Sequence, residues 1–341
     1  MIDLSILLVS WNVREYLRNC LSSIVLSSQN LRIEIIVVDN DSHDETQKMV
    51  REEFPNVSLV SMPFNVGFPK ANNVAIRQSR GKFLLLLNPD TIVPLGTLDA
   101  CLHKISQEPS IGALGCMIRY PDGTIQFECA RRLPELLTFI IETPYLHMLA
   151  PNNRFFGRHL FGNWAHNTSR DVPCLMGAFM MLRRNAIEAI GLLDETFFMY
   201  YEDIDLCARM HEGGWRVHFL SDVHIIHFSG KSREKSVEPF DLLTTEIYFR
   251  FFLKHAGVVK AYAYRLIVFM QSLIRILLVL LVRPILMLAK NRNLTKPGLS
   301  LPLHVFRFVW SLGLHKVNLS TLGHSSVRRA NSPVSGKEAL F

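Results

Sequence analysis

Paired cysteines are absent from this 341-residue sequence: its six cysteines are scattered, and none forms a C-x-x-C pair. Several fall on apolar faces, so we interpret them as reduced core residues in a cytosolic compartment. A signal peptide is not expected either, because Asp3 and a strand-like run at residues 4–9 begin the chain almost at once. With 49% hydrophobic and 20% charged residues, the composition is that of a globular protein, which excludes a disordered chain.

Glycine is absent from the turn after the first predicted strand, where residues 10–13 are Ser-Trp-Asn-Val. A nicotinamide-dependent oxidoreductase needs a glycine-rich turn at this point of the fold. That class of enzyme is therefore excluded.

Acidic residues are absent between Ile247 and Lys337. From residue 231 onward there are 17 Lys and Arg against 5 Asp and Glu, whereas the first 230 residues have 20 against 25. This asymmetry predicts a basic appendage that faces an anionic partner, either lipid or nucleic acid. A solvated tail without a partner is the alternative. An apolar run at residues 266–289 favours an anionic membrane surface over nucleic acid.

That apolar run is long enough to span a membrane. Arg275 and Arg283 argue against a simple span, because a charged side chain is costly at the bilayer centre. We therefore expect an amphipathic helix in the membrane interface, with its cations toward lipid phosphates. A helical hairpin packed on the domain is the alternative, and whether the segment spans or lies on the membrane stays open.

The first hundred residues alternate short apolar runs with helical patterns. Helices are expected after Asn12 and Ser42, each of which has a glutamate three residues later in the capping-box spacing, and a third begins near Pro69. The series predicts an α/β fold with a parallel sheet and right-handed crossovers. The predicted strands are residues 4–9, 33–38, 57–60 and 83–87.

The pattern is less regular from residue 111 to about 170, where we expect loops and short helices. A strand is expected at 173–182, a helix at 203–212 that ends at two glycines, and two strands at 215–220 and 223–227.

Polar side chains follow three of the predicted strands where each strand ends. In a parallel α/β sheet, ligands bind beyond the carboxyl ends of the strands, so these ends predict a binding site. They are Ser10-Trp11-Asn12, Asp39-Asn40-Asp41 and Asn88-Pro89-Asp90.

Two acidic residues at these ends suit a nucleotide and a metal. Asp90 is a candidate for Mg²⁺, which proteins usually hold with one or two carboxylates plus substrate phosphates and water. A plain turn explains this tripeptide equally well, because Asn-Pro and Pro-Asp are common turn pairs. Asp39 could accept hydrogen bonds from a base or a ribose, whereas Asp41 and Ser42 could simply cap the next helix.

The segment from Asn65 to Asn73 has two unusual features. Gly67 permits close approach of the backbone at a helix start, where a phosphate or a sugar hydroxyl can bind. Asn72 and Asn73 are adjacent in an expected helix although asparagine disfavours helices, which indicates a ligand or a buried polar contact.

Tyr201-Glu202-Asp203 follows an aromatic cluster. Burial beside aromatic rings raises a carboxylate's pKa and makes it a usable base, although acids at a helix start also complement the helix dipole. His227 ends an apolar strand and could bind a metal, but a lone strand histidine is more often structural.

Taken in order, these motifs resemble the family-2 glycosyltransferases, and within them most of all the bacterial rhamnosyltransferase branch. The resemblance covers about residues 4–232. Its motifs are Ser10-Trp11-Asn12, Val38-Asp39-Asn40, Asn65-Val66-Gly67-Phe68, Asn72-Asn73, Asn88-Pro89-Asp90, Gly177-Ala178, Tyr201-Glu202-Asp203-Ile204-Asp205-Leu206 and His227.

The resemblance implies a GT-A fold, a Rossmann-like and mostly parallel α/β sheet, in residues 1–232. A nucleotide-sugar-binding half would cover 1–110 and an acceptor half 111–232, followed by a basic helical extension at 233–320 and a flexible tail at 321–341. It also implies an inverting transfer that uses Mg²⁺ or Mn²⁺. By position, Asp203 is the catalytic base; Asn12, Asp39, Asp41, Asn65, Gly67, Asn72 and Asn88 contact the donor; Gly177, Ala178 and Glu202 line the acceptor side; Asp90 and His227 bind the metal.

One departure concerns the metal position, where many relatives have Asp-x-Asp and this chain has Asn88. The site has one negative charge fewer, which predicts weaker metal binding in the absence of the donor. The branch implies rhamnose from dTDP-rhamnose as the transferred sugar, with a UDP-sugar as the alternative donor. The acceptor is expected to be a saccharide or lipid-linked saccharide of a surface polysaccharide, and the protein to lie on the inner face of the plasma membrane. A non-catalytic sugar-binding or lipid-carrier-binding protein on the same fold is the alternative function.

Overall fold

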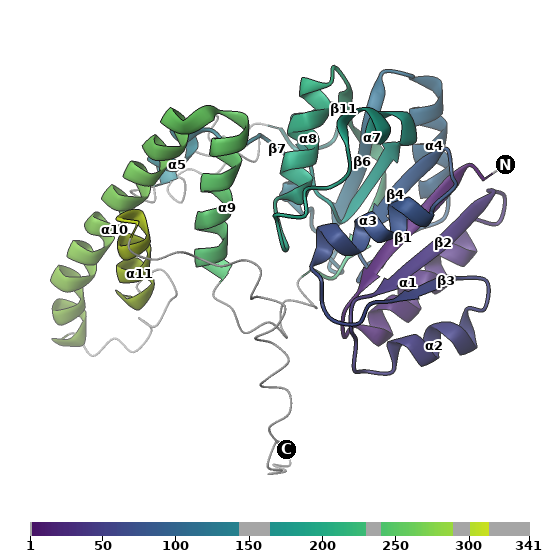
Figure 1. Ribbon diagram of the computed structural model, residues 1–341, viewed down its shortest axis with the longest axis horizontal. Helices are drawn as coiled ribbons and strands as arrows, with labels where there is room; N and C mark the ends of the chain where they lie inside the picture. Colours follow the sequence, from purple (N-terminus) through teal and green to yellow (C-terminus); the bar gives the residue numbers. More distant parts are fainter. Residues whose placement is uncertain (1, 143–163, 230–239, 289–300, 314–341) are drawn as a thin grey trace, which may run out of the picture.

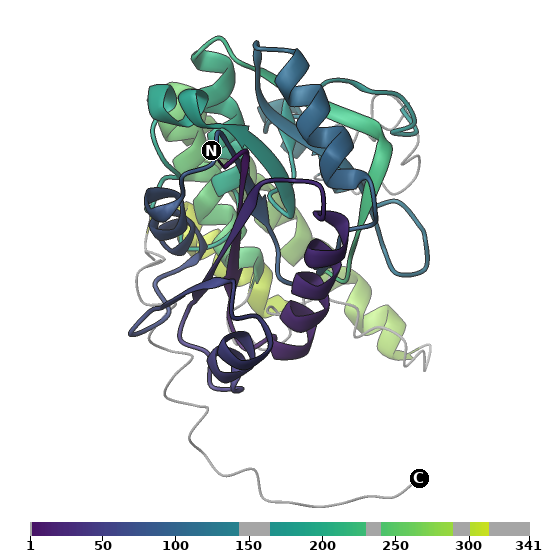
Figure 2. The same cartoon turned by 90° about the vertical axis from the view of Figure 1, so that its right-hand side faces the viewer.

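The computed structural model describes residues 2–142, 164–229, 240–288 and 301–313 (Figure 1). Within them, the main body is a nine-stranded sheet flanked by helices, and the C-terminal helices lie to one side of it (Figures 1 and 2). The strand order is β3-β2-β1-β4-β10-β6-β11-β5, and β8 pairs with β11. These strands are β1 (Leu4–Ser10), β2 (Ile33–Asp39), β3 (Ser58–Ser61), β4 (Phe83–Leu87), β5 (Thr91–Ile92), β6 (Ile111–Arg119), β8 (Arg170–Asp171), β10 (Phe179–Arg183) and β11 (Arg216–His227).

A small second sheet pairs β7 (Ala130–Arg131) with β9 (Cys174–Leu175). The helices of the main body are α1 (Arg14–Ser27), α2 (Thr46–Glu53), α3 (Phe68–Gln78), α4 (Thr97–Gln107), α7 (Arg184–Ile190) and α8 (Glu202–Glu212). The remaining helices are α5 (Leu136–Glu142), α9 (Phe240–His255), α10 (Gly257–Leu288) and α11 (Leu301–Ser311).

The parallel β-α-β series of the first half is confirmed. Strands β3, β2, β1 and β4 are neighbours and pair in parallel, and each predicted range agrees with the observed strand to within one residue. Every residue of β1 and β4 is buried, which explains their uninterrupted apolar sequences, since a parallel sheet is covered on both faces. Pro69 lies in the first turn of α3, as expected.

The two predicted capping boxes are wrong. Helix α1 begins two residues after Asn12 and α2 begins four residues after Ser42, and neither has a side-chain cap. Ser42 Oγ instead accepts a hydrogen bond from the backbone N–H of Asn12 (2.9 Å), and Asn12 Oδ1 accepts one from the N–H of His43 (2.7 Å). These polar residues therefore join the loops after β1 and β2, a contact between distant segments that a local motif does not reveal.

Strand β6 lies in the centre of the sheet, where the sequence pattern indicated loops. Gly112 and Gly115 interrupt its apolar pattern. Both positions must be glycine because neighbouring side chains pack directly against the backbone there. An added Cβ would lie 2.7 Å from the Cβ of Trp215 at the first position and 2.7 Å from Leu175 Cδ2 at the second. Helix α4, just before β6, is also an element that the sequence pattern did not indicate.

The predicted strands at 215–220 and 223–227 form one strand, β11, whose register against β6 shifts between Leu220 and His224. An irregularity of this kind interrupts a strand's pattern without ending the strand. The predicted strand at 173–182 is divided into β9 and β10, and β10 runs antiparallel to both β4 and β6. The sheet is therefore mixed. The predicted helix at 203–212 is confirmed as α8.

All six cysteines are buried and free, as the scattered spacing predicted. Four of the six lie in the nine-stranded sheet or in helices packed on it, Cys174 lies in β9 of the small sheet, and Cys129 lies in the short turn before β7. Their role within the fold is to fill the core.

Helices α9 and α10 form a hairpin against which α11 packs. Arg265 of α10 donates hydrogen bonds to the carbonyls of Trp310 (2.8 Å) and Ser311 (3.1 Å), and so holds the end of α11. Among the described residues, 257–277 form the one helical stretch long and apolar enough to cross a membrane, and 22% of its most apolar window is buried. The exposed large apolar residues of α10 are Val258, Val259, Tyr262, Leu266, Met270, Ile274, Leu277 and Leu280. The packed hairpin is therefore observed, and it leaves one apolar face of α10 exposed.

Candidate active site

The carboxyl ends of β1, β2 and β4 lie side by side. Ser10 pairs with Asp39, and Leu8 with Leu87, so Asn88 follows directly at the same edge of the sheet. The predicted meeting of these three strand ends is confirmed, and it produces a polar rim on an otherwise apolar sheet.

Asp39 is fully buried at this rim. Its Oδ2 accepts hydrogen bonds from Gln47 Nε2 (2.7 Å) and from the N–H of Ser42 (3.3 Å). Its Oδ1 is buried and has no hydrogen-bond partner within the described chain. A buried carboxylate oxygen without a donor is costly, so the geometry suits a ligand that donates a hydrogen bond there.

Asn12 and Asp41 lie in the loops on either side of Asp39. Both have positive φ, 55° and 71°, a conformation that asparagine and aspartate tolerate better than most residues. Asn12 Oδ1 is occupied by His43, and Asp41 Oδ2 lies 3.8 Å from His43 Nε2. These residues shape the wall of the rim.

Asn65 and Gly67 position the loop before α3. Asn65 Oδ1 accepts hydrogen bonds from Asn40 Nδ2 (2.8 Å) and from the N–H of Gly67 (3.0 Å). Gly67 has a φ of 86°, and an added Cβ would lie 2.6 Å from the carbonyl oxygen of Phe198. That carbonyl accepts a hydrogen bond from Phe68 (2.8 Å). Glycine is therefore needed here to admit the aromatic segment that precedes α8.

The adjacent asparagines of α3 make buried polar contacts. Asn73 Nδ2 donates to the carbonyl of Leu193 and to Glu195, both at 2.9 Å, and Asn73 Oδ1 accepts from the N–H of Leu193 (3.1 Å). Asn72 Nδ2 donates to the carbonyl of Phe68 (3.0 Å). The buried-contact interpretation thus accounts for Asn73, and Asn72 lies one turn along from the Gly67 loop.

Asp90 and His227 meet at the other side of the rim. His227 Nε2 lies 3.3 Å from Asp90 Oδ1 and 3.3 Å from Asn88 Nδ2. Gln126 determines the imidazole tautomer: its Nε2 donates to the carbonyl of His227 (2.7 Å), which turns its Oε1 toward His227 Nδ1 (3.0 Å). Nδ1 must then carry the proton, and Nε2 presents a lone pair to Asp90.

Two hydrogen-bond acceptors 3.3 Å apart, both buried, favour a cation between them. Ligands in an octahedral Mg²⁺ site lie about 3 Å from one another, and a metal-bound histidine usually donates its other ring N–H, as His227 does to Gln126. Among the described residues, no three or more His, Cys, Asp or Glu side chains are arranged so that they could hold a metal ion by themselves. The remaining ligands would therefore have to be phosphate oxygens and water.

Asp203 lies at the start of α8 and is held by several donors. Arg131 Nη2 lies 3.0 and 3.2 Å from its two oxygens. The N–H of Gly177 donates to Oδ2 (3.0 Å) and that of Ile204 to Oδ1 (2.8 Å). The carbonyl of Ala178, the residue after Gly177, accepts a hydrogen bond from the N–H of Asn88 (3.0 Å). The adjacent backbone groups of Gly177 and Ala178 thus connect Asp203 to the strand end that contains Asn88.

Glu202 is the neighbouring carboxyl group, and its Oε2 is buried without a hydrogen-bond partner in the described part of the chain. Burial raises the pKa of Glu202 to about 8, and the adjacent charge of Asp203 adds to this effect. Tyr200 and Tyr201, just before it, have φ values of 71° and 68°. Consecutive non-glycine residues in this conformation store strain of the kind found at functional sites.

Sequence reasoning did not identify Arg131, Gln126 or Gln47. Each is ordinary in its local sequence, and each becomes significant through a contact with a residue 8 to 101 positions away. Of the three, Arg131 had the clearest sequence signal of a functional role, because it is one of two adjacent arginines within the predicted acceptor half.

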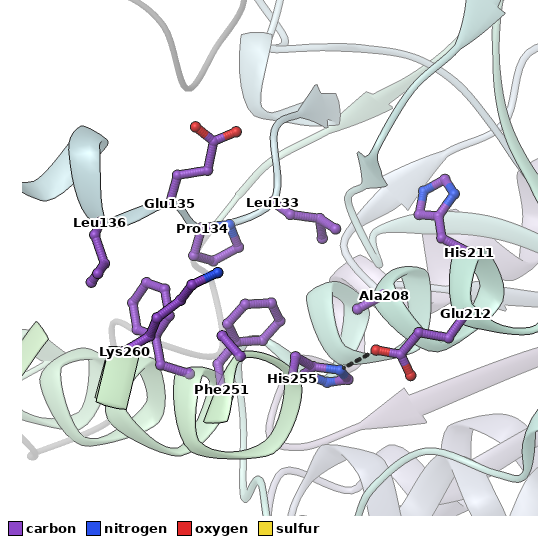
Figure 3. Close-up of a pocket in the computed structure, with 12 residues that line it drawn as sticks. Leu133, Pro134, Glu135, Leu136, Ala208, His211, Glu212, Phe251, His255 and Lys260 are labelled. Atoms are coloured by element: carbon purple, nitrogen blue, oxygen red, sulfur yellow. Dashed lines mark hydrogen bonds and ion pairs between the residues drawn. The ribbon is translucent and has the colours of Figure 1, made fainter. Parts of the chain in front are cut away.

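A cavity of about 380 Å³ lies between α8, α9 and the segment before α5 (Figure 3). Leu133, Phe251 and Phe252 line its apolar part. Two polar groups at its edge are already paired: His255 Nδ1 lies 2.8 Å from Glu212, and His211 Nε2 lies 2.9 Å from the carbonyl of Pro173. The cavity lies along α8 from the Asp203 site.

Comparison with known proteins identifies relatives of this chain. Residues 3–239 match the family model of Glycosyltransferase like family 2. The N-acetylglucosaminyl-diphospho-decaprenol L-rhamnosyltransferase of Mycobacterium tuberculosis is 29% identical over 240 residues, covering 67% of this chain and 77% of the relative. Rhamnosyltransferase WbbL of Escherichia coli is 25% identical over 231 residues, covering 66% and 83%.

Solved structures share the fold. The mannosyltransferase PcManGT of Pyrobaculum calidifontis, in complex with GDP-Man and Mn²⁺, has a TM-score of 0.52 at 15% identity, covering 96% of this chain and 80% of that one. GalNAc-T7 with UDP, GalNAc and Mn²⁺ has a TM-score of 0.51 at 14% identity, covering 67% and 44%. These matches confirm the GT-A fold.

Proposed function

Because the chain belongs to Glycosyltransferase like family 2, we propose that this glycosyltransferase moves rhamnose from dTDP-rhamnose, with inversion, to a lipid-linked saccharide. The observation that carries the proposal is the single rim at which the buried Asp39 carboxylate, the Asp90–His227 pair and the Asp203 carboxylate are joined by backbone hydrogen bonds. A non-catalytic binding protein needs the first of these but not the other two.

On the donor side, Asp39 Oδ1 would accept a hydrogen bond from the base or ribose of the nucleotide. The Asn65–Gly67 loop and the start of α3 would lie beside its phosphates and sugar. Asp90 and His227 would hold Mg²⁺ or Mn²⁺. When bound, such an ion supplies positive charge that stabilises the leaving diphosphate.

On the acceptor side, Asp203 would take the proton of the attacking hydroxyl. The hydroxyl oxygen bonds to C1 of the sugar as the bond from C1 to the diphosphate oxygen breaks, and the electron pair leaves with the nucleoside diphosphate. Attack from the face opposite the leaving group inverts C1. General base catalysis of this kind contributes about 10²–10⁴ to the rate.

The choice of rhamnose and of a lipid-linked acceptor is supported by the names of the relatives, two of which are rhamnosyltransferases. One of them acts on an N-acetylglucosaminyl-diphospho-decaprenol. A related O-antigen biosynthesis protein of Myxococcus xanthus, 28% identical over 242 residues, supports a role in surface polysaccharide synthesis. A UDP-sugar is the alternative donor.

The membrane role is supported by the C-terminal helices. The exposed apolar residues of α10 lie in a part of the chain with no acidic residue after Glu246 up to Lys337. An apolar face among basic residues suits an anionic lipid surface. We propose that the protein attaches to the inner face of the plasma membrane through this surface.

The proposal is tested by incubating the purified full-length protein with dTDP-rhamnose or a panel of UDP-sugars, a diphospho-prenyl saccharide acceptor, and Mg²⁺ or Mn²⁺. We expect rhamnosylated product from dTDP-rhamnose, with the anomeric configuration inverted by NMR, and none after chelation of the metal. Product from a UDP-sugar alone would replace the donor assignment. Saccharide binding without transfer from any donor would favour the non-catalytic alternative.

A further inference from the structure

Arg131 is a partly buried cation, with a side chain that is 22% exposed, at the proposed catalytic carboxylate. It comes from β7, its Nη2 contacts both oxygens of Asp203, and its guanidinium carbon lies 5.9 Å from the centre of the Tyr201 ring. Its Nε is buried with no hydrogen-bond partner among the described residues. Burial alone would lower the pKa of Arg131, but the charge of Asp203 outweighs this effect and raises it. The guanidinium is therefore always charged and only partly satisfied.

The pairing with Arg131 leaves Asp203 poorly placed to take a proton. Its two oxygens receive the guanidinium and two backbone N–H groups, so the lone pairs that would accept a proton are already engaged. To act as a base, Asp203 must exchange one of these donors for the acceptor hydroxyl. Arg131 is the donor that can move, because the other two belong to the backbone.

Separating the partly buried Arg131 from Asp203 costs free energy, and an anion that takes the place of the carboxylate offsets this cost. The chain leads from Arg131 directly to the cavity, whose wall begins two residues later with Leu133, Pro134 and Leu136. From the other side, Ala208 of α8 lies five residues after Asp203, about 7.5 Å along the helix axis. Arg131 and Asp203 are thus each within a few residues of the cavity wall along the chain.

The cavity suits a hydrocarbon chain. The loop before α5 and helix α9 contribute leucine, proline and phenylalanine side chains to its walls (Figure 3). Its lining also includes the charged and polar residues Glu135, His211, Glu212, His255 and Lys260. The two histidines and Glu212 already have partners. A chain that needs no hydrogen bonds can therefore fill it. Exposed apolar residues continue from it along the hairpin, at Leu253 on α9 and at Val258 and Val259 on α10.

We propose that Arg131 binds the phosphate or diphosphate of a lipid-linked acceptor and that the cavity beside α9 holds the first part of its hydrocarbon chain. On this proposal, the arriving anion takes Arg131 from Asp203 and so makes the base available only when the acceptor is in place. The proposal rests on the proposed function, of which it specifies the acceptor class and site.

The anion site is tested with Arg131→Gln and Arg131→Lys on two acceptors that have the same sugar, one as a prenyl diphosphate and one as a neutral alkyl glycoside. We expect Arg131→Gln to lower kcat/KM for the diphosphate acceptor at least tenfold more than for the glycoside, and Arg131→Lys to restore part of the difference. Equal losses on both acceptors would show that Arg131 only orients Asp203, and would overturn the anion site.

The cavity is tested with Ala256→Phe and Leu133→Trp, each of which fills it from a different wall. The matched control is Leu26→Trp, a similar enlargement on α1 of the main body at a position that is 60% exposed. Both filling variants should raise KM about tenfold for a long-chain acceptor and leave a short-chain acceptor unchanged. An effect that does not depend on chain length, in a variant with an unchanged melting temperature, would overturn the cavity site.

Binding of farnesyl diphosphate, which has no sugar, separates this proposal from the proposed function. Calorimetric titration of the wild-type protein should show binding that Arg131→Gln and Leu133→Trp both weaken. Binding without any sugar transfer would preserve the lipid site and refute the proposed function. Sugar transfer without binding of farnesyl diphosphate would support the proposed function and refute the lipid site.

Discussion

At the scale of single residues, two adjacent carboxyl groups occupy opposite environments. Asp203 receives a guanidinium and two N–H groups, whereas Glu202 is buried with an unpartnered oxygen. The first is surrounded by donors, one of which can give way to a substrate. The second is largely protonated at neutral pH, because burial and its neighbour's charge raise its pKa to about 8.

This difference predicts different effects on catalysis. Asp203→Asn should lower kcat about 10²–10⁴-fold and leave the affinity for the donor within a factor of about two, because it removes only the base. Rates from an acceptor assay and affinities from calorimetry check this. Near-wild-type transfer by Asp203→Asn would assign the base elsewhere, with Glu202 the next candidate.

Glu202 also makes stability depend on pH. Its pKa rises from an ordinary value of 4.5 to about 8 on folding, so the unfolded chain binds fewer protons between these values and stability falls as pH rises through them. Glu202→Gln should remove this loss. We expect the variant to gain a few kcal/mol relative to wild type between pH 5 and pH 8.5, measured by urea unfolding. A gain that is equal at both pH values would contradict the assignment.

Gln126 predicts a change in metal affinity. Gln126→Leu removes the acceptor that keeps the proton on His227 Nδ1, and losing such a partner typically costs 10–100-fold in metal affinity. Titration of Mn²⁺ in the presence of nucleoside diphosphate should show this loss. Gln78→Leu, at an exposed position at the end of α3, is the matched control and should have no effect.

At the scale of elements, α8 and α9 are joined by a buried ionic network. Asp205 is fully buried and contacts Arg209 (2.9 Å), Lys254 (2.7 Å) and His255 (2.8 Å). Burial alone would raise the pKa of Asp205, but the hydrogen bonds from His255 and Lys254 and the charge of Arg209 lower it to about 2. The helix that carries Asp203 is thus attached to the C-terminal helical hairpin.

Asp205→Asn should therefore destabilise the protein by roughly 3 kcal/mol, because it leaves the mostly buried Arg209 and His255 without their carboxylate. In the wild type, the contribution of Asp205 is complete above about pH 4 and is lost as the pH falls toward 2. The variant should lose less stability over that range, as measured by thermal unfolding at pH 7 and pH 3. Equal losses in both proteins would show that this network does not hold the helices together.

At the scale of the whole molecule, charge and apolar surface are separated. The main body is net acidic, and the C-terminal helices combine basic residues with an exposed apolar face. The proposed donor site and the exposed apolar face of α10 consequently belong to different parts of one chain, connected through α8 and α9 (Figure 1).

Binding to vesicles tests this arrangement. The protein should sediment with anionic vesicles, less so with zwitterionic ones, and the anionic component should weaken as salt is raised, because screening reduces the attraction. Val259→Asp should weaken binding severalfold. Leu95→Asp changes a comparably exposed apolar residue on the main body and should have no effect. Equal loss in both variants would argue against α10 as the contact surface.

The sequence by itself determined the parallel half of the sheet and the rim at its carboxyl edge. Continuous apolar runs such as that of β4 arise because a parallel strand is buried on both faces. The polar residues that follow such a run therefore mark the end of the strand. The motif order was sufficient to identify the family. Local pattern failed at β6 because its glycines serve neighbours distant in sequence, Trp215 and Leu175.

Only the tertiary structure decided how the site residues act. Asn12 joins a loop and does not cap a helix, Asn73 ties α3 to a distant turn, and Gln126 sets the proton position on His227. Asp203, the proposed base, is paired with an arginine from β7. The physical reason is the same in each case: a hydrogen bond across dozens of residues depends on where the fold brings two side chains, which no local spacing records.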